Sequence, residues 1–495
     1  MMKTILENPL LKNQCYINGK WVGAKSGQVK LLRNPANNEV LVDIPQLSRE
    51  EIKYAINAAS HAMVGWRELS GKQRSLYLRK WFDLVQAHRD DLASLIVFEE
   101  GKPFVEALAE VDYAASFIEW FAEEAKRVKG DVMAPPQAGS RIIVLKEPIG
   151  VCATITPWNF PAAMITRKIA PALAAGCTAI AKPAQQTPLT AFGLAFLAEK
   201  AGIPAGVFNV VTGKASDIGD EFTSNPIIKK ISFTGSTEIG RHLIQQSAQT
   251  IKKVSMELGG NAPFIVFNDA DVEKAVEGLI ATKFRNTGQA CISANRVYVQ
   301  EGIYDAFIQV LKDKVGKLKV GNGFDKTVQQ GPLIDTSALE KVEEHIADAL
   351  KKGANLVQGG KRHGLGGLFF EPTVLSGVTQ NMLVCREETF GPIAPVIRFH
   401  SEADVVKMAN DTEYGLAAYL FSKDAERIWR VSAAIESGMI GINTGAISNE
   451  VAPFGGIKES GLGREGSIYG MDEYLELKYL AWHGAGENKL KEGEN

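Results

Sequence analysis

One cysteine follows directly on a helical pattern, a position that suits a nucleophile. The pattern covers residues 271–287, and Gly288 is expected to end it because glycine adopts the left-handed conformation of helix ends. Cys291 lies on the exit turn, where neighbouring backbone N–H groups are expected to favour the thiolate over the thiol. Because the thiolate is the reactive form, this placement predicts covalent catalysis. The alternative is a small buried apolar side chain, as most free cysteines are.

A carboxylate followed by two glycines is the second chemical feature. Glu257 ends a short apolar strand pattern and precedes Leu258, Gly259 and Gly260. Paired glycines allow backbone and ligand to approach closely. A general base must reach its proton directly or through one water, so we consider Glu257 a candidate base beside the thiol. A solvated glutamate at a strand end is the alternative.

An asparagine follows the first strand of a strand–helix series. Asn159 lies in the turn of residues 156–161, and its side-chain N–H groups are candidate donors to an oxyanion, together with the Cys291 amide. Such donors contribute roughly 2.7–4 kcal/mol each. A turn or capping role before Pro161 is the alternative.

A glycine–serine turn between a strand and a helix indicates phosphate binding. Gly235 and Ser236 open the turn, and Gly240 completes a GxxxxG spacing. A helix N-terminus of this kind presents N–H groups and a positive dipole end to a phosphate. Strand–glycine–serine–helix turns are common. The prediction of phosphate binding therefore depends on the strand–helix alternation that precedes this turn.

Alternating apolar strands and amphipathic helices surround these motifs. Strand patterns cover 151–155, 178–182, 207–211 and 230–233, with helical patterns at 162–175, 188–201, 215–224 and 236–250. Alternation of this type predicts a parallel sheet covered on both faces. Ligands of such sheets bind beyond the carboxyl ends of the strands, where Asn159 and Gly235 lie.

The flanking segments predict further elements. Strand patterns at 14–21 and 39–44 precede helical patterns at 49–62, 71–88, 89–101 and 105–128, the first with a capping box at Ser48. A second α/β unit begins at about residue 258. Residues 140–148 and 474–480 alternate weakly and predict exposed strands. Such strands commonly pair with another chain, and an intrachain hairpin is the alternative.

Composition limits the function classes. A chain of 495 residues is long enough for two or more domains. A net charge of −2 and the lack of an apolar run of about 18 residues predict neither nucleic-acid nor membrane binding. Five scattered cysteines and the lack of a secretory pattern fit the cytoplasm. No Cys or His spacing is typical of a metal site.

The run Met256-Glu-Leu-Gly-Gly260, together with Gly288-Gln-Ala-Cys291, resembles the NAD(P)-dependent aldehyde dehydrogenases. The resemblance extends from Tyr16 to Tyr479. It implies an α/β fold with three parts. These are a doubly wound parallel-sheet cofactor domain (1–130 and 151–257), an α/β catalytic domain (258–460) and a β oligomerisation arm (131–150 and 471–495). A homodimer or homotetramer is expected.

The same resemblance implies the cofactor site, which is expected to include Trp158, Lys182, Gln185, Gly235, Ser236, Leu258, Glu388 and Phe390. Lys182 matches a contact to the adenosine ribose. Members that prefer NAD often have glutamate at the position of Gln185, and a carboxylate there repels a 2′-phosphate. We therefore expect NADP to be preferred and NAD to be accepted. The alternative is that Gln185 is a neutral loop residue.

Three residues match the branch of the family that oxidises succinate semialdehyde. In that branch the positions of Arg167, Arg285 and Ser448 hold the distal carboxylate of the substrate, a task that suits guanidinium groups. The alternative is that each arginine caps a helix or pairs with a local acid. Glutarate semialdehyde is one methylene longer, a difference of only about 1–3 kcal/mol. Ser293 replaces a second cysteine of some members, which argues against a thiol switch.

The mechanism implied by the family has two stages. Cys291 attacks the aldehyde, the oxyanion is held by Asn159 and the Cys291 amide, and oxidation leaves a thioester. Glu257 then activates a water that releases the acid. Two alternatives remain: a dehydrogenase for another aldehyde, or a binding protein that has kept the fold without the chemistry.

Overall fold

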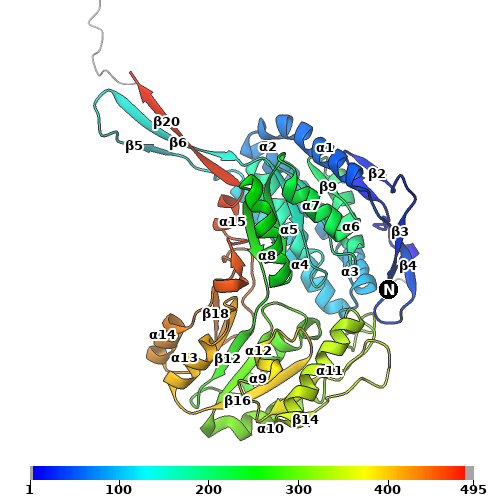
Figure 1. Cartoon of the computed structure of the whole chain (residues 1–495), viewed down its shortest axis with the longest axis vertical. Coiled ribbons are helices and arrows are strands. Elements are labelled where there is room, and N and C mark those ends of the chain that lie inside the picture. Colours follow the sequence, from blue (N-terminus) through cyan, green and yellow to red (C-terminus); the bar gives the residue numbers. More distant parts are fainter. Residues whose placement is uncertain (1–3, 485–495) are drawn as a thin grey trace, which may run out of the picture.

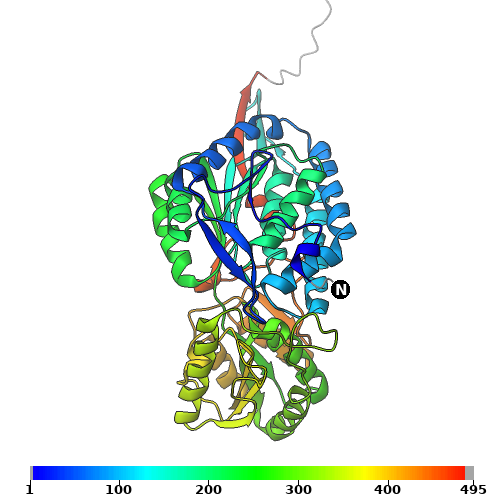
Figure 2. The same cartoon turned by 90° about the vertical axis from the view of Figure 1, so that its right-hand side faces the viewer.

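The computed structural model describes residues 4–484. These residues form two α/β lobes, one above the other in Figures 1 and 2, and a narrow β arm that projects from the upper lobe. The α/β fold class predicted from the sequence is confirmed. Part of the predicted arm, residues 485–495, lies outside the described residues.

The upper lobe is built on an eight-stranded sheet, in the order β19-β11-β10-β7-β8-β9-β1-β2. Five strands run parallel at its centre: β7 (Val151–Ile155), β8 (Thr178–Lys182), β9 (Phe208–Val210), β10 (Ile228–Thr234) and β11 (Lys253–Glu257). Antiparallel pairing adds β1 (Cys15–Ile17) and then β2 (Lys20–Val22) at one side of these strands and β19 (Gly461–Leu462) at the other. The chain continues from β7 to β8 on one side and returns to β10 on the other. The strand order therefore reverses beside β7, which opens a crevice at the carboxyl ends of β7 and β10.

Helices cover both faces of this sheet. On one face the helices are α1 (Arg49–Arg67), α7 (Ala215–Ser224) and α8 (Thr237–Ser247). On the other they are α2 (Gly71–Ala87), α3 (Arg89–Glu99), α4 (Phe104–Glu124), α5 (Ala163–Ala175) and α6 (Pro188–Lys200). Alternate residues of β7 face the two layers: Val151 and Ala153 pack with α1, and Cys152 packs with the opposite core. The capping box predicted at Ser48 is present at the start of α1.

The lower lobe holds a seven-stranded sheet, in the order β14-β15-β16-β13-β12-β17-β18. Its strands are β12 (Ala262–Val266), β13 (Ala294–Gln300), β14 (Asn355–Gln358), β15 (Thr373–Ser376), β16 (Ile393–Phe399), β17 (Ala417–Phe421) and β18 (Met439–Ile442). The larger helices around it are α9 (Val272–Lys283), α10 (Tyr304–Val315), α11 (Thr336–Lys351), α13 (Glu402–Asn410) and α14 (Ala425–Ala434).

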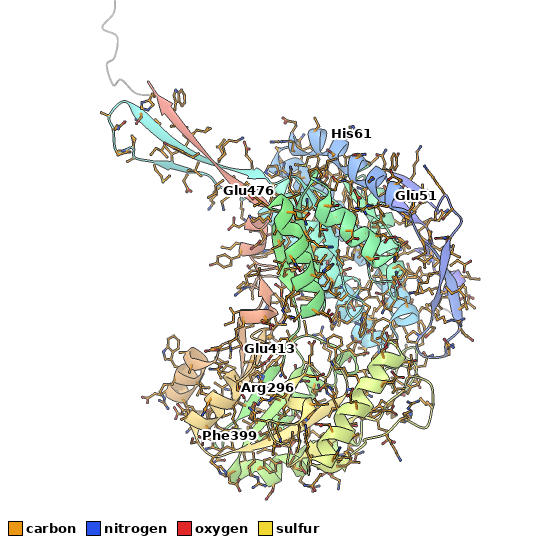
Figure 3. The ribbon with its side chains drawn as sticks, viewed as in Figure 1. Glu51, His61, Arg296, Phe399, Glu413 and Glu476 are labelled. Carbon is orange, nitrogen blue, oxygen red and sulfur yellow. The ribbon has the colours of Figure 1, made fainter. Side chains whose placement is uncertain are left out.

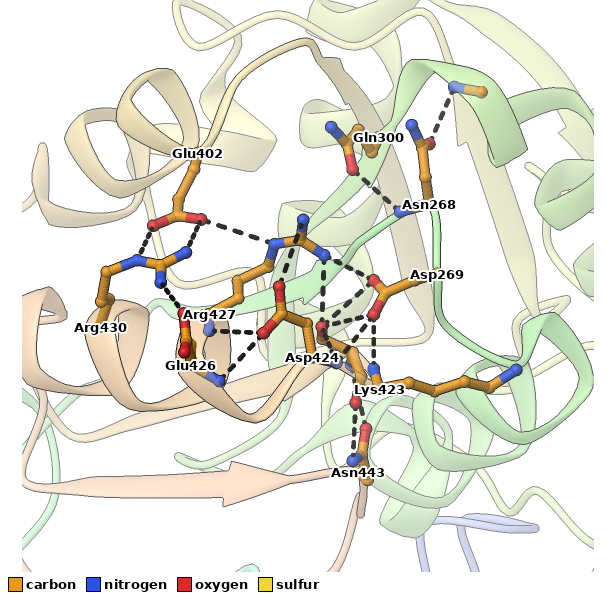
Figure 4. A network of polar contacts seen from close by, with 12 residues as sticks. Asn268, Asp269, Gln300, Glu402, Lys423, Asp424, Glu426, Arg427, Arg430 and Asn443 are labelled. Carbon is orange, nitrogen blue, oxygen red and sulfur yellow. Dashed lines mark hydrogen bonds and ion pairs between the residues drawn. The ribbon is translucent and has the colours of Figure 1, made fainter.

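Asp269 ties together the loops at one end of this second sheet (Figure 4). Its carboxylate accepts hydrogen bonds from the backbone N–H groups of Lys423 and Asp424, at 2.7 and 2.9 Å. It also accepts a hydrogen bond from the Arg427 guanidinium at 2.8 Å. The loop after β12 is thereby fixed to the loop after β17, in a region away from the crevice of the upper lobe.

Two sequence predictions in the N-terminal segment need correction. Residues 14–21 do not form one strand: β1 and β2 are joined by a turn at Asn18 and Gly19, whose φ angles are 51° and 74°. Positive φ at both turn residues is the usual geometry of a two-residue hairpin. The sequence analysis also missed β3 (Val29–Arg33), which pairs with β4 (Val40–Pro45).

The arm is a three-stranded antiparallel sheet in the order β20-β6-β5. Its strands are β5 (Asp131–Met133), β6 (Ser140–Pro148) and β20 (Leu475–His483). The strands predicted at 140–148 and 474–480 therefore pair with each other, as in the intrachain alternative. Within the described residues, β20 has β6 as its only neighbour, so one long strand edge remains open.

Candidate active site

The loop that carries Cys291 has an unusual backbone. Helix α9 ends at Lys283, so the prediction of a helix as far as residue 287 is wrong. Asn286, Thr287 and Gly288 have φ angles of 50°, 58° and 74°. Left-handed non-glycine residues are held only where surrounding contacts fix them. Here the Asn286 backbone N–H donates to Glu106 Oε2 at 2.8 Å, and the Asn286 side chain donates to the Asn159 carbonyl at 3.0 Å.

The Cys291 thiol does not have the low pKa that the sequence predicted. Burial raises the pKa of the thiol to about 12, the negative charge of Glu388 adds to this effect, and Arg167 opposes it. Loss of solvation therefore outweighs the local backbone N–H groups. In the protein alone, the thiol is the protonated form at neutral pH.

Cys291 faces a cavity of about 210 Å³ at the carboxyl ends of β7, β10 and β11. Eight residues predicted from the sequence line it: Trp158, Asn159, Gly235, Ser236, Leu258, Cys291, Glu388 and Phe390. The sequence analysis missed four others: Pro157, Met164, Thr234 and Gly259. Pro157, Thr234 and Gly259 each lie next to a predicted residue in the sequence, and Met164 lies in the first turn of α5. Their closeness in sequence to the predicted motifs could have indicated them.

Asn159 is held through both its backbone and its side chain. The buried ammonium of Lys102 and the Asn286 side chain donate to its carbonyl, at 2.7 and 3.0 Å. Its own Nδ2 donates to the Gln289 carbonyl at 2.9 Å, and its Oδ1 has no partner among residues 4–484. An amide nitrogen carries two hydrogens, so one N–H remains for a ligand in the cavity.

Glu257 is buried at the end of β11 and does not line this cavity. Burial raises the pKa of its carboxyl group well above the usual range, and the charge of Glu465 adds to the shift. Arg167 and Lys168 oppose it. Its Oε2 atom has no hydrogen-bond partner in the described part of the chain. The carboxylate is close enough to raise the pKa of Cys291, so base and thiol share one electrostatic environment.

The N-terminus of α8 opens onto the cavity. Ser236 is its N-cap residue, and the serine side chain makes no capping hydrogen bond. Gly240 packs directly on Leu258: a Cβ atom at residue 240 would lie 2.4 Å from Leu258 Cδ2. The Ser236 hydroxyl, which does not cap the helix, and the helix N–H groups fit a cofactor phosphate.

Glu388 and Phe390 form the opposite wall. Glu388 Oε1 accepts a hydrogen bond from the Gly260 backbone N–H at 3.1 Å, and burial raises the pKa of this carboxyl group to about 7. Phe390 has a φ angle of 52°, and its ring lies edge-on to Trp158 with 5.6 Å between centroids. The two rings contact each other and together give the cavity an apolar surface, as a nicotinamide or a small aldehyde requires.

The chain crosses from the upper to the lower lobe through Gly259 and Gly260, directly against the nucleophile. The Ser460 hydroxyl donates to the Gly259 carbonyl at 2.7 Å, and the Gly259 N–H donates to the Thr237 hydroxyl at 3.3 Å. A Cβ atom at residue 260 would lie 2.3 Å from the Cys291 carbonyl oxygen. Glycine is therefore required for this approach. Beyond the crossover, the buried Arg296 (Figure 3) holds the Asn261 carbonyl at 2.8 and 3.0 Å.

Lys182 and Gln185 lie outside the cavity that contains Cys291. Burial and the nearby Lys30 lower the pKa of Lys182 to about 8. Gln185 donates to the Gly213 carbonyl at 3.0 Å and accepts a hydrogen bond from Lys30 Nζ at 2.5 Å. Gln185 and Lys30 line a second cavity of about 760 Å³ beside the β3–β4 hairpin. Lys30 had not been singled out from the sequence, because no local motif connects it to Gln185.

The two arginines predicted to hold a substrate carboxylate lie over aromatic rings. Arg167, buried in α5, lies 3.9 Å from the Phe454 ring centre, and Arg285 lies 4.8 Å from that of Phe160. Arg167 Nη2 is 2.7 Å from Glu465 Oε2, so this arginine does pair with a local acid. Even so, its Nε and Nη2 atoms make no hydrogen bond of ordinary geometry within residues 4–484.

Arg285 and Ser448 are the other two residues predicted to hold the substrate carboxylate. Arg285 is half-buried and forms no ion pair with any described residue. Ser448 lies in the half-buried loop before Phe454. Burial raises the pKa of the Tyr113 hydroxyl, while Arg167, the Ser448 hydroxyl and Arg285 all oppose this shift. All three predicted residues therefore lie near one side chain.

Residues 4–484 contain no group of three or more His, Cys, Asp or Glu side chains arranged to hold a metal ion. Among the helices of this range, none is long and apolar enough to cross a membrane.

Comparisons with known proteins identify the class. Residues 21–480 match the model of the aldehyde dehydrogenase family, and the chain belongs to this family. It is 60% identical over 474 residues to a succinate-semialdehyde dehydrogenase [NADP(+)] of Escherichia coli, covering 96% of this chain and 98% of the relative. It is 59% identical over 475 residues to a glutarate-semialdehyde dehydrogenase of Pseudomonas aeruginosa, with the same coverage.

A solved structure of a succinate-semialdehyde dehydrogenase from Burkholderia pseudomallei superposes with a TM-score of 0.96. It is 58% identical, with 97% of this chain and 100% of that chain covered. The protein is an aldehyde dehydrogenase.

Proposed function

We propose that this protein oxidises succinate semialdehyde to succinate, with NADP preferred over NAD. The observation that carries the proposal is the half-buried guanidinium of Arg285, which forms no ion pair with any described residue, has Glu106 as an acidic neighbour and lies near the buried Arg167. Arg167 already has Glu465 as its counter-ion, so Arg285 is the cation over an aromatic ring that still lacks a paired anion, which is unfavourable. A carboxylate at the far end of the substrate supplies that anion in bidentate geometry.

The chemistry begins at Cys291. The thiol first loses its proton to solvent, the thiolate sulfur attacks the aldehyde carbon, and the side chain of Asn159 and the Cys291 N–H stabilise the oxyanion of the resulting thiohemiacetal. A bound nicotinamide cofactor would supply the acceptor for the hydride that the thiohemiacetal loses, and this oxidation would leave a thioester on Cys291. Glu257 takes a proton from a water that attacks the thioester, which releases succinate and restores the thiol.

Residues around the two cavities fit a dinucleotide. The α8 N-terminus and Ser236 receive the pyrophosphate, and Trp158, Leu258 and Phe390 supply apolar surface. Glu388 binds the nicotinamide ribose, and Lys182 the adenosine ribose. Gln185 carries no charge that would repel a 2′-phosphate, and the ammonium of Lys30 lies 2.5 Å from its Oε1. A second cation at this point favours NADP.

The test is turnover of succinate semialdehyde, measured by absorbance of the reduced cofactor. Butanal, which has a methyl group in place of the carboxylate, is the matched control substrate. Parallel reactions use NADP and NAD, with Cys291→Ala as the inactive control. We expect a much higher kcat/KM for succinate semialdehyde and for NADP. Equal kcat/KM for the two aldehydes refutes the proposed carboxylate site.

Glutarate semialdehyde is the second candidate, because a relative of 59% identity bears the name glutarate-semialdehyde dehydrogenase. Its extra methylene changes discrimination by only about 1–3 kcal/mol. The ratio of the two kcat/KM values, measured with one enzyme preparation, decides between the candidates. A ratio above one for the longer substrate reverses the assignment.

We further propose the domain boundaries given above, an oligomerisation role for the arm, and a cytoplasmic location consistent with the five free cysteines. The open edge of β20 and the exposed side chains of Leu477, Tyr479 and Trp482 support assembly into a homodimer or homotetramer. Light scattering tests assembly, with Leu477→Pro as the variant that removes an N–H from the edge. A monomeric wild-type protein refutes it.

A further inference from the structure

Tyr113 carries a buried hydroxyl that the sequence analysis did not single out. It lies in α4, and its ring packs edge-on against Phe117 with 4.9 Å between centroids. The hydroxyl oxygen is shielded from solvent and makes no hydrogen bond of ordinary geometry to residues 4–484, although the Ser448 hydroxyl is near enough for a weak one. Because an unpaired buried hydroxyl is unfavourable, a partner from outside the chain is expected.

The surroundings of this hydroxyl carry positive charge. Phe117 is shared with Arg167, whose guanidinium lies 5.6 Å from its ring centre. Helix α4 also packs directly against α5, which carries Arg167. Arg285 and the hydroxyl of Ser448 are close enough to act on Tyr113 as well. Glu465 is the acidic neighbour, and it is already paired with Arg167 and Lys168.

Two separate groups at this place lack partners. The first is the Tyr113 hydroxyl, and the second is Arg167 Nε, since Arg167 Nη2 already lies 2.7 Å from Glu465 Oε2. Hydroxyl and guanidinium groups are both donors to anions, and an ionised carboxylate offers about four lone-pair positions. The group formed by Tyr113, Arg167, Arg285 and Ser448, here termed the tail site, has donors enough to occupy all of them.

We propose that the Tyr113 hydroxyl donates a hydrogen bond to the acid tail of the substrate and makes the tail site selective for carboxylate-ended aldehydes. The inference rests on the proposed function and adds a residue to it. Tyr113 sets specificity and is not a catalytic residue, because it is absent from the cavity where Cys291 meets the aldehyde carbon.

Tyr113→Phe is the discriminating variant, because it keeps the ring and its contact with Phe117 and removes one oxygen. Tyr54→Phe is the matched control, since Tyr54 is exposed on α1 and lies outside both cavities. Steady-state kinetics are measured at saturating NADP with succinate semialdehyde and with butanal. Inhibition by succinate, which has the same tail without the aldehyde, is the second measurement.

Loss of a hydrogen bond to a charged group predicts a rise of roughly tenfold or more in KM for succinate semialdehyde and in Ki for succinate. The KM for butanal should stay the same, and kcat should stay within about twofold. Tyr54→Phe should match the wild type in every value.

The outcomes separate this inference from the proposed function. If the wild type prefers succinate semialdehyde and Tyr113→Phe leaves KM and Ki unchanged, the role of Tyr113 is refuted while the proposed function stands. An equal rise in KM for both aldehydes also refutes it, because that result indicates a packing role. A wild type that does not distinguish the two aldehydes refutes both.

Discussion

Lys102→Met tests whether a buried ion pair positions the oxyanion donor. Lys102 is buried between Glu110 Oε2, at 2.6 Å, and the Asn159 carbonyl, at 2.7 Å. The other Glu110 oxygen accepts the Ala162 N–H at 2.8 Å, just before α5 begins. One ammonium therefore joins α4 to the turn that carries Asn159.

The expected loss of stability follows from the carboxylates that remain. Methionine fills the volume but leaves Glu110, and Glu100 at 3.9 Å, without their cation. Breaking a buried pair from one side costs roughly 3–5 kcal/mol. Asn159 also loses one of the two donors to its carbonyl, so the turn that carries its side chain is held less tightly. A lost oxyanion donor lowers kcat by about 10²–10³-fold, and we expect a displaced one to lower it by roughly tenfold.

Urea unfolding at fixed protein concentration measures the first effect, and kcat with succinate semialdehyde measures the second. Lys53→Met is the control, since Lys53 forms an exposed pair with Glu50 that should contribute less than about 1 kcal/mol. Lys102→Met/Glu110→Gln should recover part of the stability, because it removes one uncompensated charge. A Lys102→Met protein within about 1 kcal/mol of wild type, with unchanged kcat, refutes the reasoning.

Three further predictions concern pH and a loop contact. Since burial raises the pKa of both Glu257 and Cys291, their reactive ionised forms increase with pH, so kcat/KM should rise from pH 6 to pH 9; a flat profile contradicts the assignment. Lys182 has a pKa of about 8 and loses its charge above that pH, so the ratio of NADP to NAD affinity should fall between pH 7 and pH 9, and Lys182→Met should remove this dependence. Asp269→Asn weakens the hydrogen bonds to Lys423 and Arg427 and should destabilise the protein by about 1–3 kcal/mol with normal kcat; a loss of kcat at full stability would contradict a structural role.

The central sheet was predictable because each of its strands is a short apolar run between helices of clear period. The helix predicted at 215–224 has the same bounds as α7. The helix predicted at 271–287 extends too far because Phe284 continues the apolar pattern. Contacts from Glu106 and Asn159, more than a hundred residues away, hold Asn286 in its left-handed conformation. The residues next to Asn286 in the sequence do not predict these long-range contacts.

The site was predictable where residues form continuous motifs, as at Gly235–Ser236 and Glu257–Leu258. The pKa of Cys291 was not, because burial depends on the whole fold and outweighs the nearby amides. Lys102 and Tyr113 were missed for a related reason: Lys102 lies in the loop between α3 and α4, Tyr113 lies within α4, and neither belongs to a motif. Lys102 meets Asn159 across 57 residues of sequence.

The Gly259–Gly260 crossover has a consequence for how the protein evolves and can be re-engineered. Its backbone is bound by Thr237 and Ser460 on one side and by Glu388 on the other, and it touches the Cys291 carbonyl. A backbone tied to both lobes cannot serve as a hinge, so ligands must exchange without the lobes swinging apart at this point. The lobes are likewise not interchangeable modules. A chimera that joins the upper lobe of one family member to the lower lobe of another keeps its nucleophile in place only if these crossover contacts come from matched partners.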